Sequence, residues 1–208
     1  MLRRFPLAYL TIVVLVALTR AVTGHPTVEG WGMSPDELGQ GHVWLLATSA
    51  LIVNGVVVPQ IVALALTIPA ALRHMSARYV TAVMVAAHVG ATLLAYLILL
   101  TGTGDADGVN GHSNDYGTSA VWLGLLGALV VAALPEARAG DRLAGLFIAA
   151  ATGTAIGAVA LFSLMTSTEH ALAFALGAGL ATLRELRRRG RRSARSAAAR
   201  EYVPAEPA

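Results

Sequence analysis

The sequence predicts an all-α integral membrane protein, a bundle of six transmembrane helices with both termini in the cytoplasm. Three observations lead to this fold class: a mean hydropathy of +0.65, long apolar runs, and arginines confined mainly to alternate loops. Hydrophobic residues make up 56% of the 208 residues and charged residues only 13%, which is too apolar for an ordinary soluble domain. Cysteine is absent, so disulfides and thiolate chemistry are excluded.

Six apolar runs are long enough to be candidate membrane spans, at about 1.5 Å of rise per helical residue. The first follows Arg3 and Arg4 and could resemble a signal peptide, but Arg20 and Pro26 follow it in place of a small-residue cleavage site. We therefore expect it to remain as a helix. The predicted spans are Phe5–Val22, Val56–Leu72, Tyr79–Leu100, Ser119–Leu134, Leu143–Met165 and His170–Leu183.

The stretch from Gly41 to Gly55 is only half hydrophobic and ends in the turn-forming pair Asn54-Gly55. This pattern favours a re-entrant or interfacial segment over a seventh crossing.

Loop charges predict the orientation. Arginines lead the chain and cluster in two short loops and in the C-terminal segment, at Arg73 and Arg78, at Arg138 and Arg142, and from Arg184 to Arg200. Cytoplasmic loops carry an excess of basic residues, so these segments are expected inside and the arginine-free loops outside. An even number of spans follows, in agreement with the six apolar runs, and the expected location is the cell membrane.

The chain divides into three predicted parts. Residues 1–40 hold the first transmembrane helix and an outer loop, residues 41–184 form the membrane core, and residues 185–208 form a basic, disordered cytoplasmic tail. The basic run could suggest nucleic acid or anionic lipid. We interpret it as a stop-transfer anchor that also contacts lipid head groups, with the bilayer and not nucleic acid as its partner.

Two polar residues are expected at matching depths in the membrane. The fourth span, from Ser119 to Leu134, is only about 24 Å long, and the sixth, from His170 to Leu183, about 21 Å. Both helices run from outside to inside, so Ser119 and His170 each lie at a recessed outer end.

Small residues predict that the fourth and sixth spans touch. Ala120, Gly124 and Ala128 recur at four-residue spacing in one, and Ala173, Gly177 and Ala181 in the other. Such ridges allow close helix approach in membranes. Across this contact Ser119 and His170 could form a dyad, in which a neutral imidazole accepts the hydroxyl proton as the serine attacks a carbonyl.

These residues resemble the rhomboid family of intramembrane serine proteases, and in detail a divergent actinobacterial rhomboid-like group. Gly117-Thr118-Ser119-Ala120 looks like the family's nucleophile motif, with Asp115 completing an Asp-x-Gly-x-Ser pattern. The segment EHALAFALGAG, Glu169–Gly179, looks like the histidine motif, and HVWLLATSALIVNG resembles the segment before the second helix. The resemblance covers roughly Gly41 to Arg184 and implies a six-helix rhomboid-like core.

Two positions depart from the family pattern. Ala120 replaces the glycine that follows the nucleophile, and our alignment places Val58 and Val62 where active rhomboids carry a His and an Asn that support the oxyanion. Losing such a donor typically costs about 3 to 4 kcal/mol of transition-state stabilisation. The remaining candidates for supporting the site or the oxyanion are Gly117, Thr118, Asn54 and Gln60, together with the Ser119 N–H at the helix N-terminus.

Simpler structural roles exist for each of these residues. A serine at a helix start is commonly an N-cap, and an intramembrane histidine often bonds to a neighbouring helix. We interpret His88, in the middle of the third span, as a buried hydrogen-bond partner. His25, His42, His112 and His170 lack metal-ligand spacing, and neither a metal nor a cofactor is predicted.

The expected function is hydrolysis of transmembrane substrates near their outer ends, with Ser119 as nucleophile and His170 as base. The loop from Thr101 to Tyr116 would flank the entrance, with Asp115 and Tyr116 shaping the turn. The alternative is a non-catalytic rhomboid-like pseudoprotease that binds membrane-protein clients. A transporter is disfavoured, because His88 is the only deep ionisable group expected in the spans.

Overall fold

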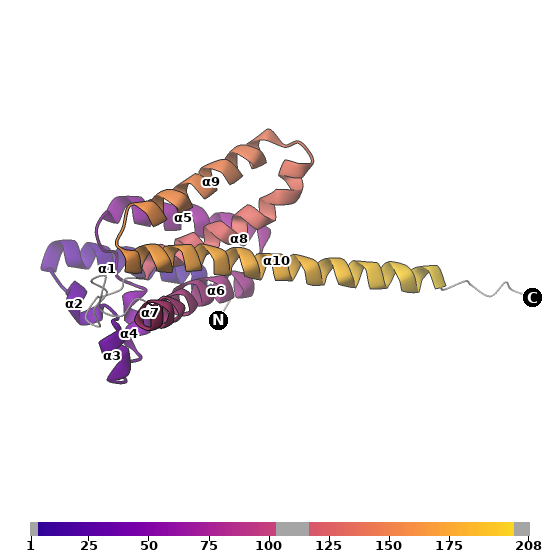
Figure 1. The fold of residues 1–208 in the computed structure, drawn as a ribbon. Coiled ribbons are helices and arrows are strands. Elements are labelled where there is room, and N and C mark those ends of the chain that lie inside the picture. Colours follow the sequence, from indigo (N-terminus) through magenta and orange to yellow (C-terminus); the bar gives the residue numbers. More distant parts are fainter. Residues whose placement is uncertain (1–3, 103–116, 202–208) are drawn as a thin grey trace, which may run out of the picture.

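The computed structural model describes residues 4–102 and 117–201, and every regular element in these ranges is helical (Figure 1). The elements are α1 (Phe5–Thr23), α2 (Val28–Trp31), α3 (Pro35–Gly39), α4 (Leu45–Ser49), α5 (Val57–His74), α6 (Ala77–Val85), the π-helical turn η1 (Ala86–Gly90), α7 (Ala91–Gly102), α8 (Thr118–Arg138), α9 (Arg142–Ala160) and α10 (Leu164–Glu201).

Five helical segments among the described residues are long and apolar enough to cross a membrane: Phe5–Thr23, Val57–His74, Ala77–Ile98, Thr118–Arg138 and Arg142–Ala160. The chain is therefore a multi-pass membrane protein. Helix α10 is not one of the five. Its apolar half follows the polar pair Glu169-His170 and gives way to arginines from Arg184 onward.

One predicted boundary is wrong. The fifth span was expected to run to Met165, but α9 ends at Ala160 and Met165 lies in the first turn of α10. The chain turns here because Ser167 Oγ donates hydrogen bonds to the carbonyls of Val159 and Phe162, at 2.6 and 3.1 Å. This turn brings the beginning of α10 back against the end of α9.

The stretch from Gly41 to Gly55 does not cross the bundle. It holds only the short helix α4, followed by irregular backbone whose carbonyls accept three hydrogen bonds from two other parts of the chain. Tyr9 Oη donates to the carbonyl of Ala50 at 2.6 Å, Arg20 Nη1 to that of Val53 at 2.8 Å, and Thr118 Oγ1 to that of Ile52. These bonds provide donors to backbone carbonyls, which lipid chains cannot do. They also attach the segment to α1 and to the beginning of α8.

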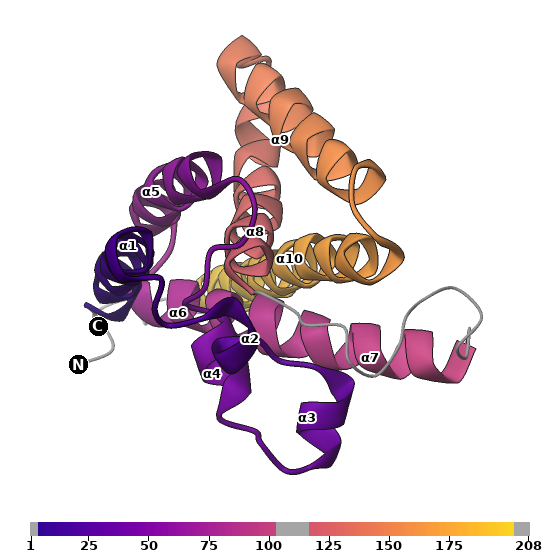
Figure 2. The ribbon, with the colours of Figure 1, turned by 90° about the vertical axis from the view of Figure 1, so that its left-hand side faces the viewer.

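Helix α8 lies at the centre of the bundle and packs against α5, α6, η1, α9 and α10 (Figure 2). Its contact with α10 is the most extensive in the molecule. Two glycines face each other at this contact: a Cβ on Gly177 would lie 1.8 Å from the Gly124 carbonyl oxygen. Of the other small residues expected at this contact, Ala120, Ala128 and Ala173 are fully buried, and Ala181 is 7% exposed.

The segment after Arg184 is not disordered through its whole length, contrary to expectation. Helix α10 continues as far as Glu201 and extends away from the bundle as one long helix (Figure 1). Arginine and alanine both favour helix, and Arg189 bonds to Glu185 one turn earlier, at 3.1 Å. The first proline in this segment is Pro204, so nothing in the intervening sequence breaks the helix.

Replacing Gly177 with alanine should destabilise the bundle. The new methyl group would collide with the rigid backbone of α8, and such overpacking costs about 1–3 kcal/mol or more. The matched control is Gly179→Ala on the same helix, where an added Cβ meets nothing within 4 Å. Thermal unfolding in detergent should show a lower midpoint for Gly177→Ala and an unchanged or raised midpoint for Gly179→Ala. Equal midpoints for the two variants would contradict this packing.

Candidate functional site

The structure brings Ser119 and His170 together at one end of the α8–α10 contact. Ser119 lies in the first turn of α8, and its Oγ is 2.8 Å from Nε2 of His170, which lies near the beginning of α10. His170 is buried, with 3% of its surface exposed. The N-cap of α8 is Gly117, and no side chain caps this helix end. The Ser119 hydroxyl therefore contacts the imidazole and does not serve as a helix cap.

The imidazole of His170 is held in one orientation by α9 and the turn after it. Nδ1 lies 3.0 Å from the carbonyl oxygen of Ala158, and the ring of Phe162 meets the imidazole edge-on, with the ring centroids 5.3 Å apart and an interplanar angle of 86°. A carbonyl can only accept a hydrogen bond, so Nδ1 carries the proton. In the neutral ring Nε2 is then the acceptor and faces the Ser119 hydroxyl.

A cavity of about 350 Å³ opens beside the pair. Its walls come from the segment before α5, from α5 itself, and from α8, α9 and α10. The lining residues are Asn54, Gly55, Val56, Pro59, Gln60, Ala63, Ser119, Trp122, Thr154, Ala158, Phe162, Thr166 and His170. Apolar and polar side chains contribute about equally to this lining, a mixture that can both bury a ligand and orient it.

Two of the four candidates for supporting the site line this cavity. Gln60 Nε2 donates to the backbone carbonyl of Asn54 at 2.6 Å, so the side-chain amide is held at the cavity wall and its second N–H remains available. The other two candidates do not line the cavity. The N–H of Gly117 donates to the carbonyl of Ser49 at 3.1 Å, and the Thr118 hydroxyl donates to the carbonyl of Ile52.

The register expected for α5 is wrong. Val58 and Val62 were aligned with the family's oxyanion pair, but they are 70% and 49% exposed and lie outside the cavity. The positions of α5 that line it are Pro59, Gln60 and Ala63. Val58 and Val62 share one face of the helix, as residues four apart do, and that face is turned away from Ser119.

His88 is a buried hydrogen-bond partner, as predicted. Its Nε2 lies 2.6 Å from the carbonyl oxygen of Leu46 and 3.3 Å from Oγ of Ser49. Its imidazole also lies directly against Gly117, where a Cβ would come within 1.7 Å of Nδ1. The π-helical turn η1 interrupts the third span at His88, and such turns are frequent at functional sites. His88 thus connects the segment around α4 to the residue that begins α8.

Several features of the site were not predicted. The carbonyl of Ala158 is a backbone group, so no residue type in the sequence signals its role. Phe162 could not be placed because the turn between α9 and α10 was expected to be part of a helix. Arg20 was treated only as a flanking charge, although its bond to Val53 fixes the residue before Asn54. An arginine in an apolar span is the signal that could have revealed it.

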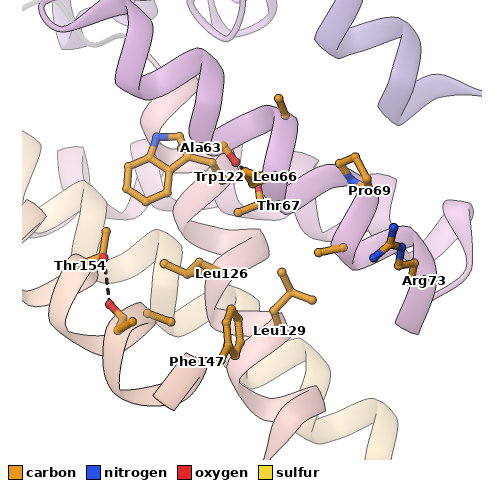
Figure 3. Close-up of a pocket in the computed structure, with 14 residues that line it drawn as sticks. Ala63, Leu66, Thr67, Pro69, Arg73, Trp122, Leu126, Leu129, Phe147 and Thr154 are labelled. Carbon is orange, nitrogen blue, oxygen red and sulfur yellow. Dashed lines mark hydrogen bonds between the residues drawn. The ribbon is translucent and has the colours of Figure 1, made fainter. Parts of the chain in front are cut away.

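Trp122 also lines the site and was not predicted. Its indole Nε1 is buried and has no hydrogen-bond partner among the described residues. Trp122 borders the cavity beside Ser119 and a second, larger cleft of about 650 Å³ between α5 and α9. Figure 3 shows this cleft, with Ala63, Leu66 and Arg73 of α5 on one side and Phe147 and Thr154 of α9 on the other.

Three expectations concern other polar residues. Asp115, Tyr116 and His112 lie outside the described residues. His42 pairs with Glu37 on the segment before α4. Among the residues that the structure describes, no group of three His, Asp or Glu side chains is placed to hold a metal ion.

A Gly117→Ala substitution should disturb the site through His88. The added methyl group would overlap the imidazole, so either His88 leaves the carbonyl of Leu46 or the beginning of α8 shifts, at a cost of about 1–3 kcal/mol. Gly145→Ala in α9 is the control, because nothing lies within 4 Å of its added Cβ. Thermal unfolding and nuclear magnetic resonance of His88 should both change in Gly117→Ala and stay unchanged in Gly145→Ala. Unaltered His88 resonances in Gly117→Ala would refute the contact.

The arrangement provides a serine hydroxyl bonded to an oriented base, next to a cavity that reaches the surface of the bundle. This is the general requirement for nucleophilic catalysis by serine. Comparison of the chain with protein-family models, with curated proteins and with solved structures gives no match.

Proposed function

We propose that this protein is a rhomboid-type intramembrane serine protease that hydrolyses peptide bonds of transmembrane substrates with the Ser119–His170 dyad. The observation that carries the proposal is the 2.8 Å contact between Ser119 Oγ and His170 Nε2, with Nδ1 held by Ala158. The base therefore has its lone pair directed at the nucleophile, and a third group orients the base.

The reaction proceeds through an acyl-enzyme. Ser119 Oγ attacks the carbonyl carbon of the scissile bond while its proton passes to Nε2 of His170, forming a tetrahedral intermediate. The intermediate collapses, the C–N bond breaks, and the imidazolium donates that proton to the leaving amine. Water then attacks the Ser119 ester, with His170 again acting as base, and releases the carboxylic acid product.

Donors for the oxyanion come from two sources in this proposal. The N–H of Ser119 belongs to the first turn of α8, where backbone donors have no partner within the helix and the helix dipole favours negative charge. The amide of Gln60 lines the same cavity and can supply a second donor. Gln60 would then replace the His and Asn pair that the family carries on this helix.

The cleft between α5 and α9 is the proposed route for a substrate. It is lined mainly by apolar side chains and shares Ala63, Trp122 and Thr154 with the catalytic cavity. An extended substrate segment that unwinds near Trp122 could bond its carbonyl to the indole N–H, since a buried donor needs a partner. The cleft would let a helix in the bilayer reach Ser119 laterally.

The proposal includes the membrane arrangement expected from the sequence. Helix α10 supplies a sixth crossing through its apolar half, both termini lie in the cytoplasm, and Ser119 is recessed below the outer surface of the cell membrane. The polar pair at the beginning of α10 belongs to a bundle interior, where intramembrane ionisable groups are commonly functional. Glu169 is 1% exposed, and Thr92 Oγ1 donates to its Oε1 at 2.8 Å.

A second candidate is a pseudoprotease that binds membrane clients without cleaving them. The observation that favours it is the composition of α5 at the cavity. This helix presents Pro59 and Ala63 there, and neither a His nor an Asn of α5 lines the cavity as in active rhomboids. In this function the α5–α9 cleft holds a client helix, and the Ser119–His170 pair is only a helix contact. Client capture would then survive His170→Ala, and no membrane substrate would be cleaved.

Labelling by a serine-directed fluorophosphonate tests the dyad. Wild-type protein in membranes should be labelled, and Ser119→Ala and His170→Ala should both lose labelling, because the first lacks the nucleophile and the second its base. Ser76→Ala is the control, since Ser76 is exposed before α6, its side chain does not cap that helix, and it does not line the cavity. Folded wild-type protein that resists the probe would favour the pseudoprotease.

Gln60 provides a separate test of the oxyanion donors. Gln60→Ala should slow labelling or substrate cleavage about 10²- to 10³-fold, the effect typical of removing one oxyanion donor, with little change in thermal stability. Val58→Ala is the matched control on the same helix, because Val58 is exposed and lies outside the cavity. If Gln60→Ala retains the full rate, the amide has no role in the reaction.

A further inference from the structure

A third pocket lies at the opposite, arginine-rich end of the bundle and has no part in the dyad chemistry. It has a volume of about 210 Å³ and lies between the end of α5, the last turns of α8 and the middle of α10. Its walls are His74, Met75, Val131, Ala132, Pro135, Ala181, Arg184, Glu185 and Arg188.

Three basic side chains line this pocket, and they come from two helices. His74 is the last residue of α5, while Arg184 and Arg188 are one turn apart on α10 and therefore lie on the same face. The single acidic residue of the wall, Glu185, bonds to Arg189 at 3.1 Å. The wall thus carries a net positive charge even with His74 neutral.

Arg184 is held at this wall by an aromatic ring. Its guanidinium carbon lies 4.8 Å from the centroid of Tyr79, near the beginning of α6. A cation over an aromatic face is attracted to the ring, so this guanidinium loses less conformational freedom when it binds an anion. A guanidinium in a fixed position can bond two phosphate oxygens at once.

The remaining wall is apolar. Met75, Val131, Ala132 and Ala181 line the pocket, and the helices that carry Val131 and Ala181 continue into the apolar body of the bundle. The pocket therefore pairs cationic groups with an apolar surface where the ends of α5 and α8 meet the middle of α10. An amphiphile with a phosphate head group matches both parts, whereas a free phosphate ion matches only the first.

We propose that this pocket binds the phosphate head group of an anionic phospholipid, with His74, Arg184 and Arg188 contacting the phosphate and an acyl chain lying along α8 and α10. The site is independent of the dyad, because no residue of the catalytic cavity lines it. It makes the basic half of α10 a specific lipid-binding element as well as a topological anchor.

The experiment measures binding of the purified full chain, in neutral detergent, to mixed micelles containing phosphatidylglycerol. Basic groups near an anionic lipid surface contribute about 1 kcal/mol each, so Arg188→Gln should weaken binding about fivefold and Arg184→Gln/Arg188→Gln about thirtyfold. The matched control is Arg187→Gln, the neighbouring exposed arginine that does not line the pocket. It should bind like the wild type, and thermal unfolding verifies that all variants are folded.

Two further measurements decide the source of the phosphate. Phosphatidylcholine micelles should bind weakly to the protein and should fail to displace phosphatidylglycerol. Inorganic phosphate at matched ionic strength should behave in the same way. Displacement by inorganic phosphate at comparable concentration would overturn the lipid assignment in favour of a free anion. An equal loss in Arg187→Gln and Arg188→Gln would overturn the pocket itself, since only the total charge would then matter.

Discussion

The close approach of α8 and α10 at Gly124 and Gly177 is the constraint on which the rest of the structure depends. An added Cβ on Gly177 would overlap the opposing carbonyl, so the two backbones are in direct contact. Helices in a bilayer gain little from hydrophobic burial against each other and associate through such packing and through hydrogen bonds. The same contact fixes the separation of Ser119 and His170, which lie toward one end of it. Toward its other end it sets the distance between the walls of the pocket lined by Pro135 and Arg184.

The beginning of α8 is positioned from the opposite side by the segment around α4. Ser49 and Ile52 accept hydrogen bonds from Gly117 and Thr118, and His88 fills the space that a side chain at Gly117 would need. Buried polar groups of this kind determine a structure strongly, because each lost bond leaves an unsatisfied group in an apolar interior. Ser119 is therefore held by backbone hydrogen bonds at the beginning of α8, while the imidazole of His170 is oriented by the Ala158 carbonyl of α9.

Residue patterns with a strong physical cause could be predicted from the sequence. Apolar runs located the five most apolar helical segments to within about five residues at each end, and small residues at four-residue spacing indicated which faces of α8 and α10 meet. Contacts made by backbone carbonyls, such as that of Ala158, could not be predicted, because every residue type has a carbonyl. The positions of Val58 and Val62 were also predicted wrongly, because valines occur on every face of an apolar helix. The helical part of the segment after Arg184 was not predicted, because its high charge suggested disorder.

The unbroken course of α10 has a mechanical consequence. One helix carries His170 near its beginning and Arg188 about 27 Å farther along, at 1.5 Å per residue, and Gly177 rests on α8 between them. A helix resists bending because bending strains its hydrogen bonds. The arginine-bearing half of α10 and His170 are therefore parts of one stiff element, so a shift of this helix along its axis would move both by the same amount.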